Sequence, residues 1–176
     1  MSHPQQREFI NTVRCKFPGF FYGTTVLEVG SLNINGTLRD FFTDCTYTGI
    51  DVAEGLCVDI VCQGQHFRSP EPFDVVISAE MMEHNPFWAE TFENMVALTR
   101  SGGLLAFTCA GRDRPEHGTT RSAPETSPLT VGLEWDYYGN VLPEDFDRFP
   151  MGEWFTDWAI TENLASCDTY GYGIRR

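Results

Sequence analysis

Basic residues are scarce in this sequence of 176 residues, which carries 12 Lys and Arg against 25 Asp and Glu. The net charge of −13 and the isoelectric point near 4.5 argue against sequence-independent binding to nucleic acid or to anionic membranes, because both need a cationic surface. No nucleic-acid partner is therefore expected. Much of the acidic excess serves as solvated surface, and a neutral or cationic small ligand is compatible with it.

The sequence also lacks long apolar runs and paired cysteines. Its apolar stretches fall far short of the roughly 18 residues that a membrane helix requires, and it has no recognisable signal peptide. The six cysteines form no C-x-x-C pair, which excludes a zinc-ribbon pattern and argues against a disulfide framework. These absences predict a soluble cytoplasmic protein without membrane insertion.

Short apolar segments alternate with helical patterns, which is typical of an α/β fold with a mostly parallel sheet. Strands are expected over residues 25–29, 46–51, 58–62, 73–78 and 104–109, with helices up to about residue 15 and over residues 35–42 and 87–98. Ser101-Gly102-Gly103 is predicted to end the last of these helices. One domain over residues 1–176 is sufficient for this length.

The amino-acid composition changes after the fifth predicted strand, and the hydrophobic periodicity ends there. Residues 110–128 hold glycine, proline, serine and threonine without periodicity, so we predict an inserted loop or lid over about 110–140. A short helix is expected at 142–146, where proline and acids suit a helix start. Two further strands are predicted at 155–161 and 169–174.

The segment VLEVGSLNING, followed by YTGID, predicts a strand, a turn and a second strand that ends in Asp51. Gly30 allows a ligand to approach the backbone, and the turn residues Ser31 and Asn35 precede a helix start that favours an electronegative group. Asp51 lies 23 residues beyond Glu28, close to the spacing at which such an acid binds ribose hydroxyls.

This turn departs from the dinucleotide fingerprint G-x-G-x-x-G. Glycine would be required at positions 32 and 35, where the chain has Leu32 and Asn35, so a pyrophosphate would meet side chains. A ligand with ribose but without pyrophosphate fits better. In the alternative interpretation, Gly30 and Gly36 only permit tight packing between the strand and the following helix.

A cluster of ionisable residues follows the strand at 73–78. Glu80, Glu83 and His84 lie within five residues. If this segment is helical, Glu80 shares a face with Glu83 or His84, which follow it by three and four residues. Two carboxylates and an imidazole suit a magnesium, manganese or zinc site, or a base held by an acid. Alternatively, Glu83 and His84 only cap or brace the next helix.

Two further candidates follow other strands. Gln63 and Gln65 follow the third predicted strand, and an amide there can both donate and accept hydrogen bonds at the edge of an adenine ring. It is equally plausible that these residues are only exposed turn glutamines. His117 follows the fifth strand and is a second candidate base or substrate contact. The aromatic residues of WDYYGN at 135–140 fit core packing better than a cover for the site.

The motifs VLEVGSLNING, YTGIDV, FDVVISAEMMEH, SGGLLAFTC and DYYGNVLPEDF together resemble those of class I S-adenosylmethionine-dependent methyltransferases. The resemblance runs from about Val26 to the C-terminus. It implies an α/β, Rossmann-like three-layer sandwich with a seven-stranded, mostly parallel sheet and an antiparallel last strand at 169–174. It also implies S-adenosylmethionine as cofactor and a small-molecule methyl acceptor.

Carried over by position, the implied cofactor-binding residues are Glu28, Gly30, Ser31, Asn35, Asp51, Gln63, Ser78, Ala79 and Glu80. Glu28 and Gly30 match the motif that holds the methionine part of the cofactor. Asp51 matches the position that binds the ribose hydroxyls, and Gln63 matches the position near the adenine amino group. Residues 78–80 would flank the sulfonium end. The chain departs from the family at positions 32 and 34, where glycines are usual, and at Gln63, where an acid is usual.

The string E-x-x-E-H at Glu80, Glu83 and His84 is similar to the fourth motif of metal-assisted O-methyltransferases of quinone biosynthesis. The resemblance therefore implies Mg²⁺ or another divalent metal at these three residues. The implied reaction is direct displacement of the methyl group onto an oxygen or nitrogen, with His84 or His117 as base. The alternatives are a non-catalytic protein that binds the cofactor or its product, and an NAD-dependent oxidoreductase.

Overall fold

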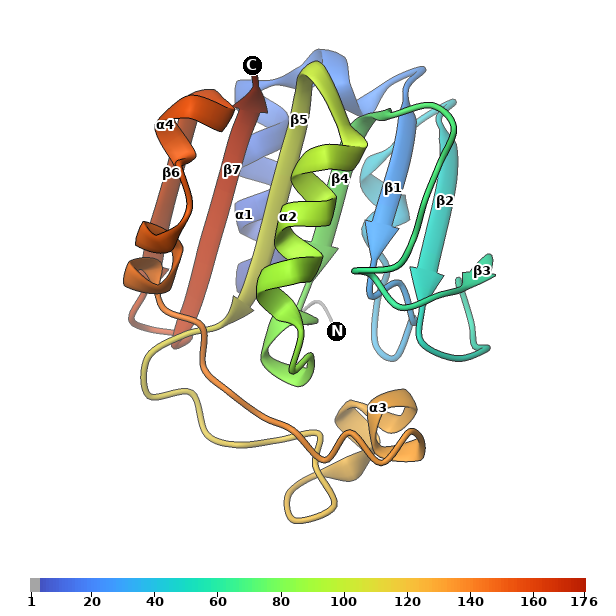
Figure 1. Cartoon of the computed structure of the whole chain (residues 1–176), viewed down its shortest axis with the longest axis vertical. Coiled ribbons are helices and arrows are strands. Elements are labelled where there is room, and N and C mark those ends of the chain that lie inside the picture. The colour runs from blue at the N-terminus through green and yellow to red at the C-terminus, as the bar shows by residue number, and fades with distance from the viewer. Residues whose placement is uncertain (1–3) are drawn as a thin grey trace.

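The computed structural model describes residues 4–176 and contains one seven-stranded sheet in the order β3-β2-β1-β4-β5-β7-β6 (Figure 1). The strands are β1 (Thr25–Val29), β2 (Thr46–Asp51), β3 (Ile60–Val61), β4 (Phe73–Ala79), β5 (Thr99–Ala110), β6 (Phe155–Asn163) and β7 (Asp168–Arg175). Strands β1 to β5 pair in parallel, and β7 is antiparallel to both β5 and β6. The predicted fold class, with its antiparallel last strand, is confirmed.

The helices are short apart from α1 and α2. The α-helices are α1 (Pro4–Lys16), α2 (Trp88–Leu98), α3 (Pro128–Gly132) and α4 (Met151–Trp154). The 3₁₀ helices are η1 (Pro18–Phe21), η2 (Leu38–Phe41), η3 (Met82–His84), η4 (Pro124–Thr126) and η5 (Pro143–Arg148). None of the helices in residues 4–176 has the length and apolarity needed to cross a bilayer.

Both faces of the sheet are buried, because helices cover each of them. Neighbouring residues of a strand point to opposite faces, so each central strand contributes side chains to both cores. On β1, Val26 packs in the cluster of Ile10 from α1, whereas Leu27 packs in the cluster of Phe92 from α2. Helix α1 lies behind the sheet and α2 in front of it (Figure 1). The three layers are therefore α1 with η1 and η2, the sheet, and α2 with η5 and α4.

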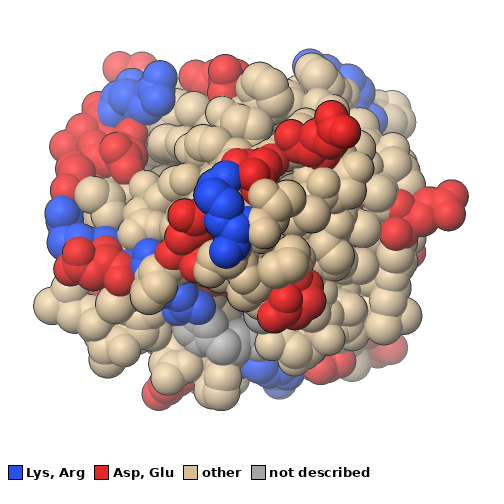
Figure 2. Space-filling model, turned by 90° about the horizontal axis from the view of Figure 1, so that it is seen from below, with Lys and Arg blue, Asp and Glu red and all other residues tan. Residues whose placement is uncertain are grey.

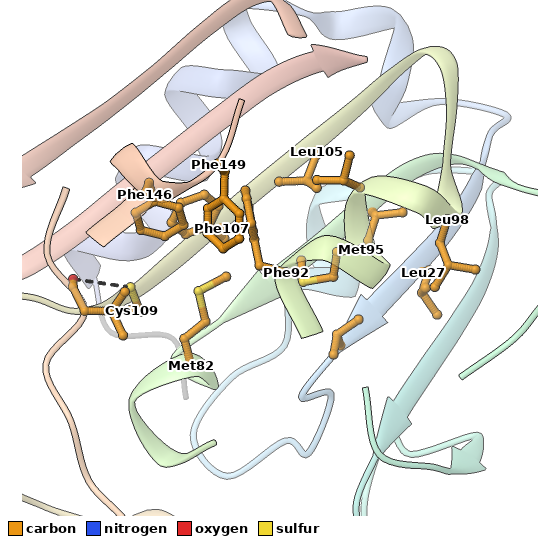
Figure 3. Close-up of a cluster of buried hydrophobic side chains, with 14 of the residues drawn as sticks. Leu27, Met82, Phe92, Met95, Leu98, Leu105, Phe107, Cys109, Phe146 and Phe149 are labelled. Carbon is orange, nitrogen blue, oxygen red and sulfur yellow. Dashed lines mark hydrogen bonds between the residues drawn. The ribbon is translucent and has the colours of Figure 1, made fainter. Parts of the chain in front are cut away.

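Aromatic rings dominate the core on the α2 side (Figure 3). Phe92 of α2 lies 5.0 Å from Phe146 of η5 and 5.1 Å from Phe149, measured between ring centroids. Phe107 of β5 stacks on Phe146 at 5.0 Å. Buried phenylalanines each remove a large apolar area from water, so this cluster fixes η5 against α2 and the sheet.

Three predicted elements are wrong in extent. The helix expected at 35–42 is a single 3₁₀ turn over Leu38–Phe41, because the side chain of Asn33 accepts a hydrogen bond from Gly36 N (2.9 Å) and holds the preceding segment in a turn. The strand expected at 58–62 is limited to Ile60–Val61. The strand expected at 104–109 is longer and spans Thr99–Ala110.

Helix α2 ends at Leu98, before the glycines that were expected to end it. The hydroxyl of Thr99 donates to Met95 O (2.8 Å), and the chain enters β5 directly. The pairing of β4 with β5 shifts between Phe73 and Val75, so the extra residues around Gly102, which has a φ of 70°, form an irregularity in the strand.

We expect Gly171→Ala to destabilise the protein by about 2 kcal/mol in chemical denaturation. A Cβ at Gly171 of β7 would lie 2.3 Å from two ring atoms of Phe107, which is only 1% exposed and has little room to move. Gly152→Ala on α4 is the matched control, because a Cβ there has no heavy atom within 4 Å. Equal stability of the two variants would contradict the packing argument.

Glu28 is an acid buried inside the β1–β2 layer. It is 4% exposed, and its Oε2 accepts a hydrogen bond from the hydroxyl of Tyr47 (2.8 Å). Burial raises the pKa of Glu28 from 4.5 to about 7, and the bond from Tyr47 opposes this only in part. Since the folded state then holds the proton more tightly than the unfolded state, stability falls as pH rises from about 4.5 through about 7.

We therefore expect Glu28→Gln to be more stable than the parent protein above pH 7, by up to about 3 kcal/mol, and to lose this advantage below pH 5. Glutamine keeps an acceptor for Tyr47 but has no charge to bury. Urea denaturation at several pH values measures the difference. An advantage that does not change between pH 5 and pH 8 would show that Glu28 does not titrate in this window.

Candidate functional site

A pocket of about 70 Å³ lies at the carboxyl ends of β1, β2 and β4. Because these strands are parallel, the loops that follow them meet at the same edge of the sheet. Residues 111–142, which we call the excursion, pass below this edge with α3 (Figure 1). Thr126 to Thr130 and Trp135 of the excursion line the pocket, and Trp135 contacts the ring of Phe87 at 5.8 Å.

Gly30 and Asp51 line this pocket, as predicted. Gly30 has a φ of 81°, and a Cβ there would lie 2.6 Å from Met81 Cβ, so only glycine fits between β1 and η3. The carboxylate of Asp51 accepts hydrogen bonds from Leu32 N (3.0 Å) and Val52 N (2.8 Å). Burial raises the pKa of Asp51, and these two N–H groups oppose the rise.

Most of the other predicted cofactor residues lie outside the lining of the pocket. Glu28 is bound to Tyr47 within the sheet layer, and the hydroxyl of Ser78 donates to Val29 O (2.7 Å). Ala79 and Ser31 are buried, and Asn35 is exposed. These residues point away because strand side chains alternate between faces and because the expected helix at 35–42 is absent.

Gln63 does not line the pocket either, although its neighbours Cys62 and Gly64 do. Its Oε1 accepts a hydrogen bond from Gln65 Nε2 (3.0 Å). Gln65 in turn accepts one from the hydroxyl of Thr91 (3.3 Å) on α2. The amide of Gln63 is therefore part of a chain of hydrogen bonds that links the end of β3 to α2.

The sequence reasoning missed most of the apolar wall of this pocket. The missed lining residues are Val29, Leu32, Ile34, Ile50, Val52, Cys62, Gly64, Met81, Asn85, Thr126, Ser127, Pro128, Leu129 and Thr130. Trp135, for which core packing was preferred over a cover for the site, also lines the pocket. The missed residues before position 100 lie at or just after the ends of predicted strands. Their position in the sequence could therefore have indicated that they line the pocket. The residues of the excursion offered no periodicity that indicated their place.

A second cavity of about 320 Å³ adjoins the first. It is lined by Glu80, His84, Thr126 and residues 114–117, and Glu80, His84 and Thr126 line both cavities. The ring of His84 lies 5.0 Å from that of His117, and Tyr138 lies 5.0 Å from His117. The two predicted catalytic histidines therefore lie together at the junction of the cavities.

The two histidines differ in their surroundings. His84 is 4% exposed, its Nδ1 has no hydrogen-bond partner among the described residues, and burial followed by His117 lowers its pKa to about 3. His117 is less buried, and its Nδ1 lies 3.0 Å from Pro115 O. Because a carbonyl only accepts, Nδ1 of a neutral His117 carries the proton and Nε2 keeps a free lone pair.

Two buried carboxyl groups stand beside these rings. Glu83 is fully buried, and burial raises its pKa to about 7. Burial and then the charge of Glu83 raise the pKa of Glu80. Glu80 Oε1 and both oxygens of Glu83 have no hydrogen-bond partner within the described part of the chain. Such groups require a ligand, a proton or solvent to satisfy them.

One set of side chains has the spacing of a metal site. Ligand atoms of Glu83, His84 and His117 all lie within 4.8 Å of one another. The predicted set contained Glu80 in place of His117, and Glu80 does not belong to the set that the structure brings together. Sequence spacing alone gave no indication of His117, which comes from the excursion.

The excursion is held together by Arg121. Its guanidinium donates to Glu116 Oε1 (3.0 and 2.7 Å) and to Asp136 Oδ2 (2.7 Å), and Thr120 also binds Asp136 through its N–H and its hydroxyl. The two limbs of the excursion are therefore joined close to the cavities. Acidic side chains lie across this face of the molecule, with basic ones beside them in a few places (Figure 2).

No protein-family model matches the chain. The ubiquinone biosynthesis O-methyltransferase of Coxiella burnetii is 26% identical over 185 residues, which cover 92% of this chain and 74% of that protein. The N-methyltransferase NodS of Bradyrhizobium japonicum WM9, solved with S-adenosylhomocysteine, matches with a TM-score of 0.63 at 14% identity and covers 99% of this chain and 89% of NodS.

A phosphoethanolamine N-methyltransferase 2 of Haemonchus contortus, solved with phosphomonomethylethanolamine and S-adenosylhomocysteine, matches with a TM-score of 0.65 at 13% identity. This match covers 96% of this chain and 52% of that one. The solved structures establish the fold, and the curated relative and the sequence motifs agree with it. The chain thus has the fold of methyltransferases solved with S-adenosylhomocysteine, and its sequence is similar to that of an O-methyltransferase.

Proposed function

We propose that the protein transfers the methyl group of S-adenosylmethionine to an oxygen or nitrogen of a small molecule. The observation that carries this proposal is the pair of adjoining cavities with the common wall of Glu80, His84 and Thr126. We call the first the cofactor pocket and the second the acceptor cavity. A methyl group at this common wall has only a short path to an acceptor atom, as an in-line displacement requires.

The cofactor pocket suits a nucleoside without a pyrophosphate. Asp51 offers carboxylate oxygens for ribose hydroxyls, and the side chains of Leu32 and Ile34 occupy the loop where a dinucleotide fold would expose backbone N–H groups. This arrangement disfavours NAD. The acceptor cavity and its histidines favour catalysis over a protein that only binds the cofactor.

Several features support a small acceptor. The excursion covers the cofactor pocket with Thr126 to Thr130 and Trp135, and the acceptor cavity is of about the size of a small-molecule site. The relative from Coxiella burnetii is named for ubiquinone biosynthesis, and the Haemonchus contortus enzyme was solved with phosphomonomethylethanolamine. The acidic net charge of the chain disfavours polynucleotides.

His117 is the better base of the two histidines. Its Nε2 lone pair is free because Nδ1 is engaged with Pro115 O, and it lines the acceptor cavity. His84 is more buried and lies against it, so it limits the positions that the ring of His117 can take. The acceptor atom attacks the methyl carbon, the bond from that carbon to sulfur breaks, and His117 receives the acceptor's proton.

A divalent cation is a second candidate for the same cluster. The three ligand atoms of Glu83, His84 and His117 within 4.8 Å, and the unpartnered oxygens of Glu83, fit Mg²⁺, Mn²⁺ or Zn²⁺. Such an ion would lower the pKa of an acceptor hydroxyl bound to it. His117 would then be a ligand in place of a base.

Asp51→Ala should weaken S-adenosylmethionine binding by about tenfold or more in titration calorimetry, because charge-assisted hydrogen bonds to the ribose are lost. Asp147→Ala is the matched control, since Asp147 is an exposed acid on η5 away from both cavities. Thermal unfolding of both variants checks that the fold is intact. Unchanged affinity in folded Asp51→Ala would refute the ribose assignment.

His117→Gln should lower the rate of methyl transfer by about 100-fold and leave the affinity for S-adenosylmethionine unchanged. Turnover is measured by mass spectrometry after incubation with labelled cofactor and a cell extract. His66→Gln controls for loss of a histidine, because His66 is exposed and lines neither cavity. A variant with full turnover would exclude His117 from the reaction.

Treatment with a chelator distinguishes the two roles of His117. If His117 is the base, turnover persists in the chelated protein. If His117 is a metal ligand, turnover stops on chelation and returns when Mg²⁺ or Mn²⁺ is added. In that case His117→Gln also weakens the binding of Mn²⁺, which is measured by electron paramagnetic resonance.

A further inference from the structure

An ion pair with a buried carboxylate connects the excursion to the sheet at the start of β7. Nη1 of Arg114 in the excursion donates to Asp168 Oδ1 (3.0 Å) and to Ser166 O (2.7 Å). The side chain of Asp168 is 0% exposed and that of Arg114 is 24% exposed. Separating such a pair would leave a charge buried without its partner, so each member constrains the position of the other.

Asp168 has a fixed place in the sheet. It is the first residue of β7, where the strand pairs with Ala110 of β5 on one side and with Asn163 of β6 on the other. Its Oδ2 accepts a hydrogen bond from the hydroxyl of Tyr170 (2.9 Å), whose ring stacks on that of Phe9 from α1 at 4.7 Å. The carboxylate is therefore a rigid anchor for Arg114.

Arg114 carries this constraint to the acceptor cavity, which it lines together with residues 115–117. Its N–H donates to Gly111 O (3.2 Å), in the limb of the excursion that leaves β5. Its carbonyl oxygen accepts hydrogen bonds from the hydroxyl of Tyr138 (3.3 Å) and from Asn140 Nδ2 (3.2 Å), in the limb that returns to η5. The sheet and both limbs of the excursion thus meet at Arg114.

His117 follows Arg114 by three residues, and its ring is held by groups that Arg114 fixes. Its Nδ1 lies 3.0 Å from the carbonyl oxygen of Pro115, the residue next to Arg114. The ring of Tyr138, whose hydroxyl binds Arg114 O, lies 5.0 Å from the ring of His117. A displacement of Arg114 would move Pro115 O and the ring of Tyr138 together, and the contact of His117 with His84 would change.

We infer that Asp168 is a positioning residue, which acts through Arg114 to fix the wall of the acceptor cavity and to hold the ring of His117 beside His84. This inference rests on the proposed function, in which His117 takes part in the transfer. Asp168 lines neither cavity, and Arg114 lines only the acceptor cavity. Because a displacement of about 1 Å at a reacting group costs up to about 100-fold in rate, a residue outside both cavities can govern turnover.

NMR of the full chain with histidine labelled at Cε1 reports the place of the ring without any acceptor. The sequence has four histidines, and the signal that is lost in His117→Gln assigns His117. Ring currents of His84 and Tyr138 act on this signal, since both rings lie within 5.0 Å of His117. In Asp168→Asn, which keeps the size of the side chain, we expect the signal of His117 to shift by more than its line width and that of His66 to stay.

Turnover and cofactor binding should respond differently to loss of the pair. Asp168→Asn and Arg114→Ala should each lower turnover, measured with labelled cofactor and a cell extract, by about tenfold or more. The affinity for S-adenosylmethionine in titration calorimetry should stay unchanged. Arg114→Lys keeps a charged donor for Asp168 and should restore part of the rate. A general loosening of the fold would instead weaken cofactor binding as well.

Arg112→Ala is the matched control. Arg112 is also a cation of the excursion, but its side chain is 45% exposed, it pairs with Glu144 and Glu162, and it lines neither cavity. Exposed ion pairs contribute little, so this variant should keep both the His117 signal and the turnover of the parent protein.

The outcomes separate the inference from the proposed function. An unmoved His117 signal or full turnover in folded Asp168→Asn would overturn the positioning role. If Asp168→Asn and Arg114→Ala do not fold, Tyr138→Phe decides, because it keeps the ring and removes one bond to Arg114 O. A shifted His117 signal in this variant supports the inference, and an unmoved one contradicts it. If S-adenosylmethionine does not bind to the parent protein, the proposed function fails, and the NMR comparison still decides whether Asp168 fixes the ring.

Discussion

Strand β4 is held on both edges, by β1 on one side and by β5 on the other, and the site depends on where this strand ends. Its residues from Val75 onward are buried, so the strand cannot slip without exposing them. The chain leaves the sheet at Glu80 in a left-handed conformation and turns at once into η3, which carries Glu83 and His84. The buried ionisable residues Glu80, Glu83 and His84 thus come from a short segment attached to a strand that is paired on both edges.

The sequence predicted the elements whose patterns depend on burial alone. The strands β1, β2 and β4 are found where apolar runs were expected, and Asp51 and Gly30 reach the pocket because they end or follow these strands. The pattern failed where local side-chain bonds decide the structure. Asn33 holds a turn in place of the expected helix, and Glu28, which the alternation along β1 points away from the pocket, accepts a hydrogen bond from Tyr47.

His117 shows the other limit of sequence reasoning. It was identified as a candidate from its place after β5, but its contact with His84 depends on the path of the excursion, which has no periodic pattern. The same is true of Trp135 and of Thr126 to Thr130, which come from a segment of glycine, proline and small polar residues. Long-range contacts of such a segment are fixed by individual hydrogen bonds and ring contacts, not by hydrophobic spacing.

The departures at Leu32 and Ile34 have a structural meaning. At the two positions where the resemblance implies glycines, this chain places apolar side chains in the wall of the pocket, and the N–H of Leu32 donates to Asp51. The Leu32 side chain also contacts the position of Gly55, where a Cβ would lie 2.3 Å from Leu32 Cδ1. The loop after β1 is therefore packed against the loop after β2.

The double contact of Arg121 with Glu116 and Asp136 has a consequence for how this protein can change over evolutionary time. It joins the two limbs of the excursion into a unit that leaves the sheet after Ala110 and returns before η5. Such a unit can be exchanged or reshaped as a whole while β1, β2 and β4 keep their ends. The lining of the second cavity can then vary within one continuous stretch of the gene, without loss of the strand ends that line the first pocket.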